Sequence, residues 1–521
     1  MIRTLSASTL LLATALAAAP ARAAGLDLLE VGGPWGTPGA TNPSAIWWNP
    51  AGLAVGGGTQ FLVEAAPLLG SVTAQRDNPS YGDVDPSVYF EGPFDPPPDT
   101  YDYSGTDKLS TLGVVPFLGV SSNFMVPGLG VGLGLAVPTA RGGASDQEWG
   151  ANRYAIRAGD IRAIHAMAGA SYQILNKVAL GASVSFVNSS YYADTDTSTY
   201  PDLAVAVREQ IDTAPFQDGY AEQRGYTTTA VLGGEKGDGH GALTDQAMTF
   251  GAGVYLTPIG NKLGISLAYN HGVRLDNEGD LTLKFQCPPQ WDAFSRLGAT
   301  SRGLCDADTG NGVVAQGTGS VGYRLPSRIH LGVVLRPIDR VRLEVMGASV
   351  MWSSFSDYEI GTNVKADQFL EYANSPELAD EAAALVSKPR LWARDAQDTF
   401  WVGADGKVRL TNMFSAGARV LYDHHAIPSA SVSANNADFD ALILGAMGQV
   451  NPIDQLGIGL SFSQQVLMSR TVTDSAFALT VDPESAKPAR YFYPSANGKY
   501  SGSITRLSLA VSGHFGGNTS W

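Results

Sequence analysis

The chain has 521 residues, of which 60 are glycine, two are cysteine and 16% are charged. Glycine is well above its average share of roughly 7% and charge is below the usual quarter, which excludes a coiled coil, a disulfide scaffold and a charge-rich disordered chain. The net charge of −15 argues against a nucleic-acid partner, because such a partner needs cations that neutralise phosphates.

The first 23 residues are organised like a secretory signal peptide. Arg3 gives a positive start, residues 10–18 are apolar, and residues 21–23 (Ala-Arg-Ala) form an A-x-A cleavage signal. An uncleaved anchor is the weaker alternative, since the apolar part is too short to cross about 30 Å of hydrocarbon. We therefore expect residues 1–23 to be removed.

Residues 24–57 precede the first expected strand, which begins near Gln60. They are rich in Gly, Pro and small residues with a few aromatic ones, and they are too apolar for a solvated tail. If the remaining chain forms a barrel with a wide lumen, we expect this segment to fold inward and occupy it.

Residues 109–140 carry no charge and resemble a membrane helix only in that respect. They hold six glycines and three prolines, which a helix interior tolerates poorly, so two strands joined near residues 123–128 fit better. No second helical span exists, and a membrane location therefore requires a closed β-barrel. The second of these strands is the one most expected to bend, at Gly130, Gly132, Gly134 and Pro138. Relief of crowding inside the barrel is the alternative role for the glycines.

Alternation of side chains supports a barrel, because strands in lipid place apolar residues outward and small or polar residues inward. In the last segment, one face has Leu507, Leu509, Val511, Gly513 and Phe515, and the other has Arg506, Ser508, Ala510, Ser512 and His514. Residues 248–257, 263–270, 414–423 and 458–463 alternate similarly. Soluble sandwiches also alternate, but their strands average about five or six residues. Trp521 continues the outward face and resembles the terminal aromatic signal read by the outer-membrane barrel-assembly machinery.

Short turns and long loops follow one another along the chain. Tight turns occur at residues 256–261, 336–340 and 451–455, where Pro sets φ and Asn, Asp or Gly completes the turn. Long polar excursions lie near residues 75–107, 191–243, 286–317, 358–396 and 470–500. Outer-membrane barrels have this asymmetry, and counting strands through the breaks gives about fourteen. The sequence thus predicts an all-β fold, a transmembrane antiparallel β-barrel over residues 58–521.

Several positive side chains share one face of an expected strand that ends at Pro337. They are Arg324, Arg328, His330 and Arg336. Charges inside a barrel usually pair with one another or with acids of the inner segment, here Asp27 or Glu30. Binding of a carboxylate is the alternative, because an arginine fork suits that group.

Cys287 and Cys305 flank an outer excursion, and in an oxidising compartment we expect them to form a disulfide worth roughly 3 kcal/mol. Two cysteines without a nearby histidine are too few ligands for zinc. The chain also lacks a G-x-S-x-G elbow, an H-E-x-x-H motif and a complete phosphate-binding loop. We expect no catalytic residues, no metal and no cofactor. A barrel phospholipase is the enzymatic alternative.

Residues 39–54 (GATNPSAIWWNPAGLA) resemble the amino-terminal hatch of the FadL-type outer-membrane transporters for long-chain fatty acids and other hydrophobic compounds. The family's Asn-Pro-Ala motif corresponds to Asn49, Pro50 and Ala51, and Ala24-Gly25-Leu26 resembles the start of its mature chains. The resemblance implies a monomeric barrel in the outer membrane of a Gram-negative bacterium, with residues 24–57 as a plug and outer-membrane lipid around it.

The resemblance also implies a route. Outer loops capture a hydrophobic small molecule, the hatch gates its passage at Asn49, Pro50 and Ala51, and the ligand leaves sideways where a strand bends, here near residues 130–138. Trp47 and Trp48, with Arg324 and Arg328, are candidates for the ligand channel, although simple packing is the alternative for the tryptophans and a plain turn for Asn-Pro. A diffusion porin for polar solutes is the alternative function.

Overall fold

The computed structural model describes residues 28–33, 36–76, 105–146, 152–153, 155–198, 227–233, 242–286, 313–355, 357–370, 376–387, 389–475 and 496–516. The expected signal peptide (residues 1–23), Cys287, Cys305 and Trp521 lie outside the described residues. The expectations about cleavage, the disulfide and the terminal aromatic residue therefore stay predictions.

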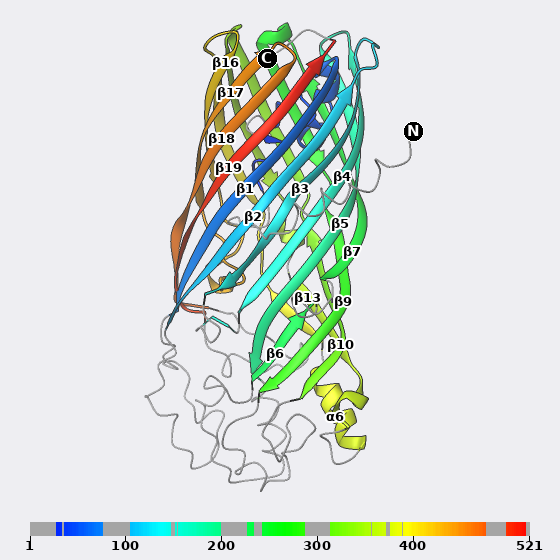
Figure 1. The fold of residues 1–521 in the computed structure, drawn as a ribbon, viewed down its shortest axis with the longest axis vertical. Helices are drawn as coiled ribbons and strands as arrows, with labels where there is room; N and C mark the ends of the chain where they lie inside the picture. The colour runs from blue at the N-terminus through cyan, green and yellow to red at the C-terminus, as the bar shows by residue number, and fades with distance from the viewer. Residues whose placement is uncertain are drawn as a thin grey trace.

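The wall is a single antiparallel sheet of nineteen strand segments, closed because β1 pairs with both β2 and β19 (Figure 1). The segments are β1 (Thr59–Arg76), β2 (Gly105–Ser122), β3 (Leu129–Ser145), β4 (Ala158–Ile174), β5 (Val178–Ser198), β6 (Thr227–Leu232), β7 (Leu243–Leu256), β8 (Leu263–Asn270), β9 (Val273–Gln286), β10 (Val314–Leu325), β11 (Arg328–Ile338), β12 (Val341–Val350), β13 (Asp357–Val364), β14 (Arg390–Ala393), β15 (Thr399–Arg409), β16 (Phe414–Asp423), β17 (Ala441–Ile453), β18 (Leu456–Val472) and β19 (Gly498–Phe515).

The number of segments differs from the predicted count of about fourteen strands. Five consecutive pairs of segments lie between the same two neighbours in the wall and are separated only by breaks: β6/β7, β8/β9, β10/β11, β12/β13 and β14/β15. The shortest breaks are His271-Gly272 and Pro326-Ser327. Three of these segments, β6, β13 and β14, lie almost entirely within the stretches expected to be long loops, residues 191–243 and 358–396. The break at Pro326-Ser327 was passed over because alternation resumes directly after it.

The expected alternation is present in the wall. In β19, Leu507 and Leu509 are about half exposed, whereas Arg506 and Ser508 are buried. Large apolar side chains are exposed in the same way on other strands, among them Met248, Phe250, Leu331, Val402 and Leu460. A wall with apolar residues outward and polar residues inward is what a strand surrounded by hydrocarbon requires.

The tight turns lie where they were predicted. β7 and β8 are joined through the 3-10 turn η4 (Gly260–Lys262). Two residues separate β11 from β12, and two separate β17 from β18. Figure 1 places these short connections at one end of the wall. Four other helical elements lie between strands: η5 (Trp352–Ser354), η6 (Ala366–Phe369), the helix α6 (Pro376–Val386) and η7 (Ser429–Ser431).

Strand β3 leaves the regular ladder next to Pro138. Its register with β4 shifts between Ala136 and Thr139, and its pairing with β2 lapses between Phe117↔Ala136 and Ser110↔Ala144. Both shifts correspond to one extra residue on β3. Over residues 136–143 the alternation disappears and every residue is buried, so this stretch lacks the exposed apolar face that the rest of the wall has.

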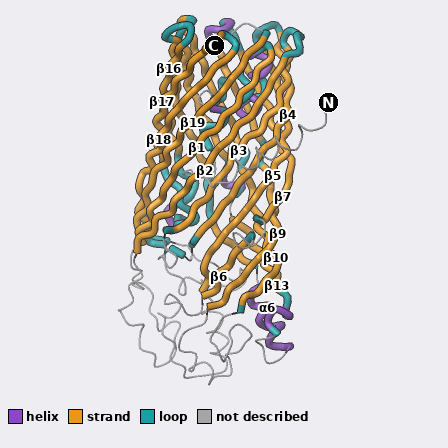
Figure 2. The backbone as a smooth tube through the Cα atoms, in the orientation of Figure 1, coloured by secondary structure: helices purple, strands orange, loops and turns teal. Residues whose placement is uncertain are grey.

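The amino-terminal segment, residues 28–58 without the undescribed positions 34 and 35, is almost entirely buried. It contains two short helices, α2 (Ala45–Trp48) and α3 (Gly52–Gly56), which contact β3, β4, β5 and β7. Figure 2 shows these helical turns within the outline of the strands and α6 beyond their far end. No helix among the described residues is long and apolar enough to cross a membrane.

Candidate lumen site and wall gap

The Asn-Pro-Ala turn is fixed to two neighbouring strands by one side chain. The amide nitrogen of Asn49 donates to the carbonyl oxygen of Val254 at 2.9 Å and to Oγ of Ser266 at 2.7 Å. Its Oδ1 accepts from the amide of Ala51 at 3.0 Å, which closes an Asx turn over Pro50. Asn49 is fully buried, and the turn therefore anchors the segment to the inner face of β7 and β8.

Glycines on the wall make room for this turn. A Cβ at Gly253 would lie 2.1 Å from Oδ1 of Asn49, and one at Gly181 would lie 2.4 Å from the backbone nitrogen of Ala51. Only a residue without a side chain permits such a close approach. Both glycines were missed by the sequence analysis, although their inward parity within the alternating strands was a usable signal.

Three predicted bending residues have the same space-making role. A Cβ at Gly130 would meet the backbone of Ala54 at 2.4 Å, and one at Gly134 would meet Ile46 at 2.9 Å. Gly132 faces Leu53 at 3.2 Å. All three lie in the paired part of β3, so they allow the segment to pack closely, and of the four candidates only Pro138 lies in the irregular stretch.

The two tryptophans have different surroundings. Trp48 is buried, donates from Nε1 to the carbonyl of Val31 at 2.8 Å and packs 5.2 Å from the ring of His330 and 6.1 Å from that of Trp401. It therefore serves to pack the segment. Trp47 lines a cavity.

The cavity beside Trp47 lies between the segment and the wall. The Trp47 ring is 5.3 Å from that of His165 and 5.7 Å from Cζ of Arg328, and its carbonyl accepts from Asn270. Apolar side chains, including Met167, complete a lining that is part apolar and part polar. Such a lining suits an apolar molecule with one polar end.

The structure corrects the prediction that Arg324 faces inward with Arg328. Arg328 is 6% exposed and lines the cavity, but Arg324 is exposed and lies opposite the buried Tyr323 and Leu325 on β10. The reason is the break at Pro326-Ser327, after which the inward positions change from odd to even numbers. The next inward residue is His330, whose Nδ1 forms a hydrogen bond with the carbonyl oxygen of Trp48 at 3.2 Å.

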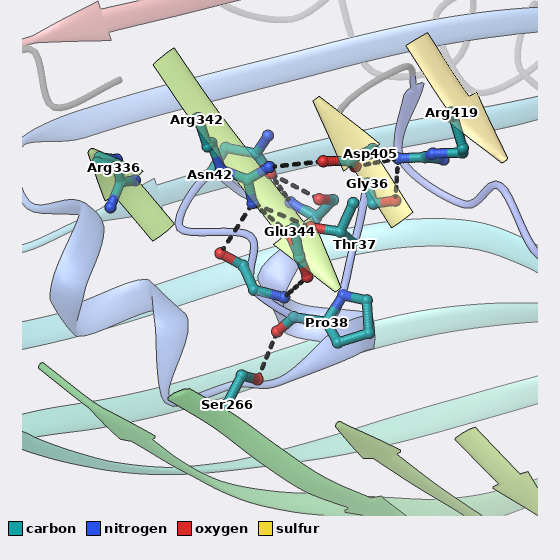
Figure 3. A network of polar contacts seen from close by, with 12 residues as sticks. Gly36, Thr37, Pro38, Asn42, Ser266, Arg336, Arg342, Glu344, Asp405 and Arg419 are labelled. Carbon is teal, nitrogen blue, oxygen red and sulfur yellow. Dashed lines mark hydrogen bonds and ion pairs between the residues drawn. The ribbon is translucent and has the colours of Figure 1, made fainter. Parts of the chain in front are cut away.

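A buried polar network fixes the segment to β12, β15 and β16 (Figure 3). Glu344 accepts from Oγ1 of Thr37 at 2.7 Å and from the amide of Gly39 at 2.8 Å, and it is paired with Arg342. Arg342 also pairs with Asp405 at 3.1 Å. Asp405 also pairs with Arg419 at 3.1 Å, and Arg419 donates to the carbonyl of Gly36 at 3.2 Å. The sequence analysis did not identify these charges, although Arg342 and Glu344 occupy one parity of an alternating strand.

Glu30 pairs with a cation of the wall, but with a different one from the four that the sequence suggested. Its partner is Arg506 of β19 at 3.5 Å, and Oγ of Ser463 donates to the same carboxylate at 2.7 Å. Arg506 also pairs with the buried Glu64 of β1 at 2.6 Å. Asp27, the other acid considered, lies outside the described residues.

Leu28 occupies the place where β2 and β3 are unpaired. Its amide donates to the carbonyl of Pro138 at 2.8 Å. Its side chain belongs to one buried apolar cluster with residues from both edges of the gap and from the neighbouring strands: Val115, Val137, Ala140, Ala66, Leu68 and Ile504. The start of the described chain thus closes the gap from within.

Comparisons with known proteins agree with this architecture. The family model described as outer membrane protein transport protein (OMPP1/FadL/TodX) matches residues 7–510. The structure is similar to a Pseudomonas aeruginosa FadL homologue, with 16% identity, a TM-score of 0.65 and coverage of 96% of this chain and 100% of that one. No curated protein sequence matches the chain.

Two toluene transporters have a similar fold. For the Pseudomonas putida transporter TodX the identity is 15%, the TM-score 0.59 and the coverage 92% of this chain and 95% of that one. For the Ralstonia pickettii transporter TbuX the identity is 14% and the TM-score 0.56, with coverage of 94% of this chain and 98% of that one. At these identities the likeness concerns the fold, and the family follows from the sequence model. The chain is a member of the OMPP1/FadL/TodX family of outer-membrane transport proteins.

Proposed function

We propose that this protein is a passive transporter for hydrophobic small molecules across the outer membrane of a Gram-negative bacterium. The observation that carries the proposal is the unpaired stretch between β2 and β3, closed from within by Leu28. A barrel whose inner segment covers a gap in its own wall provides a sideways path into hydrocarbon. A diffusion porin for polar solutes has no use for such a path.

In this scheme the chain has three parts. Residues 1–23 are the signal peptide, residues 24–57 are the hatch and residues 58–521 form the barrel with its outer loops. The barrel-assembly machinery inserts the chain, which acts as a monomer surrounded by outer-membrane lipid. Burial of each methylene supplies about 0.8 kcal/mol, which is enough for capture without a nucleotide or a metal.

The substrate class follows from the cavity beside Trp47. Apolar and polar side chains share its lining, and Arg328 and Asn270 are among the possible donors. The cavity is far smaller than a bound ligand, so the inner segment must move before a ligand can enter. Long-chain fatty acids, whose carboxylate Arg328 can bind, are one candidate class, and monoaromatic hydrocarbons of the kind that the related toluene transporters are named for are the other.

Gating takes place in the hatch. The contacts of Asn49 hold the closed arrangement, and the ligand must bind less tightly there than in an open arrangement, because equal affinity for both states moves nothing. Opening then requires Leu28 to leave the gap, after which the ligand passes between β2 and β3 into the membrane.

Deletion of Pro138 tests the exit. Removing one residue restores a continuous register between β3 and both of its neighbours, so the ladder closes. We expect uptake of labelled fatty acid and toluene by intact cells to fall at least tenfold, while the barrel remains folded. Deletion of Met125, which is 94% exposed in the turn between β2 and β3, is the matched control. Unchanged uptake in the Pro138 deletion would refute this exit.

A further inference from the structure

Two adjacent histidines and an aspartate meet where β16 ends and β17 begins. Nδ1 of His424 lies 2.8 Å and Nδ1 of His425 lies 2.7 Å from the same oxygen, Oδ1 of Asp440. The two imidazole rings have their centroids 4.5 Å apart. Neighbouring residues in a strand point to opposite faces, and these rings face one way because the chain leaves β16 at His424.

The backbone of all three residues is held by hydrogen bonds, at Asp440 by one from the amide of Met468 to its carbonyl at 2.8 Å. Oγ1 of Thr399 donates to the carbonyl of His424 at 2.7 Å, and the amide of His424 donates to the carbonyl of Phe400 at 3.1 Å. The amide of His425 donates to Oδ1 of Asp440 at 3.0 Å. The His424 ring also stacks on Phe400 at 5.4 Å. The side chains are therefore prearranged rather than gathered by chance on a loose loop.

We propose that His424, His425 and Asp440 form a binding site for a transition-metal ion of the Zn²⁺ class. Two imidazoles and one carboxylate are ligands that zinc accepts in four-coordinate sites with water in the fourth position, and they suit Ca²⁺ and Mg²⁺ poorly. The three ligand atoms lie within 4.8 Å of one another.

The side chains must adjust to receive the ion. Tetrahedral bonds of 2.0–2.2 Å place neighbouring ligand atoms about 3.3 Å apart. Each nitrogen must therefore withdraw from Oδ1 of Asp440 by about half an ångström, and the two nitrogens, which lie within 4.8 Å of each other, must approach by rotation of the imidazole rings. Without metal, both rings donate to this oxygen from Nδ1, because a carboxylate only accepts. When the ion binds at Nδ1, each neutral ring carries its one proton on Nε2 instead, after exchange with solvent. All three side chains are between 28% and 37% exposed, which gives the ion access from solvent.

The bound ion would connect the two ends of the segment 424–440. His424 directly follows the last residue of β16, and Asp440 directly precedes β17. Two further links join the sides of the segment: Asp438 accepts from the amides of Ala426 and Ile427, and Nη1 of Arg470 donates to the carbonyls of Ile427 and Asp438. A metal crosslink at this position restrains how far the segment can move away from the rim of the wall. Zinc in the medium would thus stabilise this part of the barrel.

The experiment uses the full chain without a polyhistidine tag, stripped of metal in detergent. We expect titration calorimetry to show one equivalent of Zn²⁺ and no heat with Ca²⁺. His425→Gln and Asp440→Asn should each weaken Zn²⁺ affinity at least tenfold. His271→Gln is the matched control, because His271 also stacks on an aromatic ring, that of Phe250 at 4.8 Å, but belongs to no group of histidines and acids among the residues that the structure describes. Its affinity should equal that of the wild type.

A second measurement needs no variant. Zn²⁺ should protect His424 and His425 from diethylpyrocarbonate at least fivefold, as mapped by mass spectrometry, and leave the modification of His271 unchanged. Wild-type affinity no greater than that of His425→Gln, or equal modification with and without Zn²⁺, would overturn the proposal. The transport proposal does not depend on this outcome, because the site is separate from the gap between β2 and β3.

Discussion

A methyl group on Gly253 would lie 2.1 Å from Oδ1 of Asn49. The hatch turn and this strand of the wall therefore fit together only if position 253 has no side chain. The relationship explains why position 253, two residues before the buried Tyr255 on the inward face of β7, is a glycine.

Gly253→Ala should consequently displace the Asn-Pro-Ala turn. The expected result is at least tenfold faster amide exchange over residues 45–56, measured by hydrogen-exchange mass spectrometry, because Asn49 loses its bonds to Val254 and Ser266. In the control Gly448→Ala, the nearest atom to the new methyl is 4.0 Å away. Equal exchange in both variants would show that the turn is not held by this fit.

Glu344→Gln should loosen the other anchor of the segment. The substitution removes a buried charge that Arg342, Thr37 and Gly39 share, and disruption of a buried pair costs about 3–5 kcal/mol. The melting temperature of the variant, measured from the shift in its gel migration on heating, should be clearly lower than that of the wild type. Glu359→Gln breaks an exposed pair with Arg274, which is worth about 1 kcal/mol at most, and its melting temperature should stay close to that of the wild type.

The tryptophans should separate binding from stability. Trp47→Ala removes an aromatic wall of the cavity and should weaken fatty-acid binding at least fivefold, measured by ligand-induced quenching, with a smaller fall in melting temperature than Trp48→Ala, because Trp47 is the less buried of the two. Trp48→Ala leaves a void between His330 and Trp401 and should mainly lower the melting temperature. The reverse pattern would assign the ligand contact to Trp48.

Leu28→Ala should weaken the seal of the gap. The variant loses most of the side chain that packs against Val137 and Val115, so we expect increased uptake of hydrophobic dyes by intact cells. Leu53→Ala makes an equal truncation at a buried position away from the gap and serves as the comparison. Dye entry that rises equally in both variants would point to general loosening of the hatch.

The sequence revealed those features that local pattern determines. Alternation located strands such as β19, and Pro with Asn or Asp located the tight turns. The Asn-Pro-Ala motif located the turn that Asn49 fixes to the wall. Each of these depends on residues that are neighbours along the chain, and so a single sequence is enough to identify them.

The features that were missed depend on partners distant in sequence. The position of Arg324 was wrong because the break at Pro326-Ser327 changes which face points inward. Glu344 was not identified because its donors, Thr37 and Gly39, lie about 300 residues earlier. Alternation indicates whether such a residue points inward or outward, but it does not identify the distant residue that it contacts.

In the proposed route, few contacts determine how often the gap opens. The side chain and amide of Leu28 cover the gap, and Oγ1 of Thr111 donates across it to the carbonyl of Gly142, so substitutions at these two positions would change the frequency of opening. The inter-strand ladders that hold the cylinder together need not be weakened for this. Permeability and mechanical robustness of the barrel are therefore separable traits.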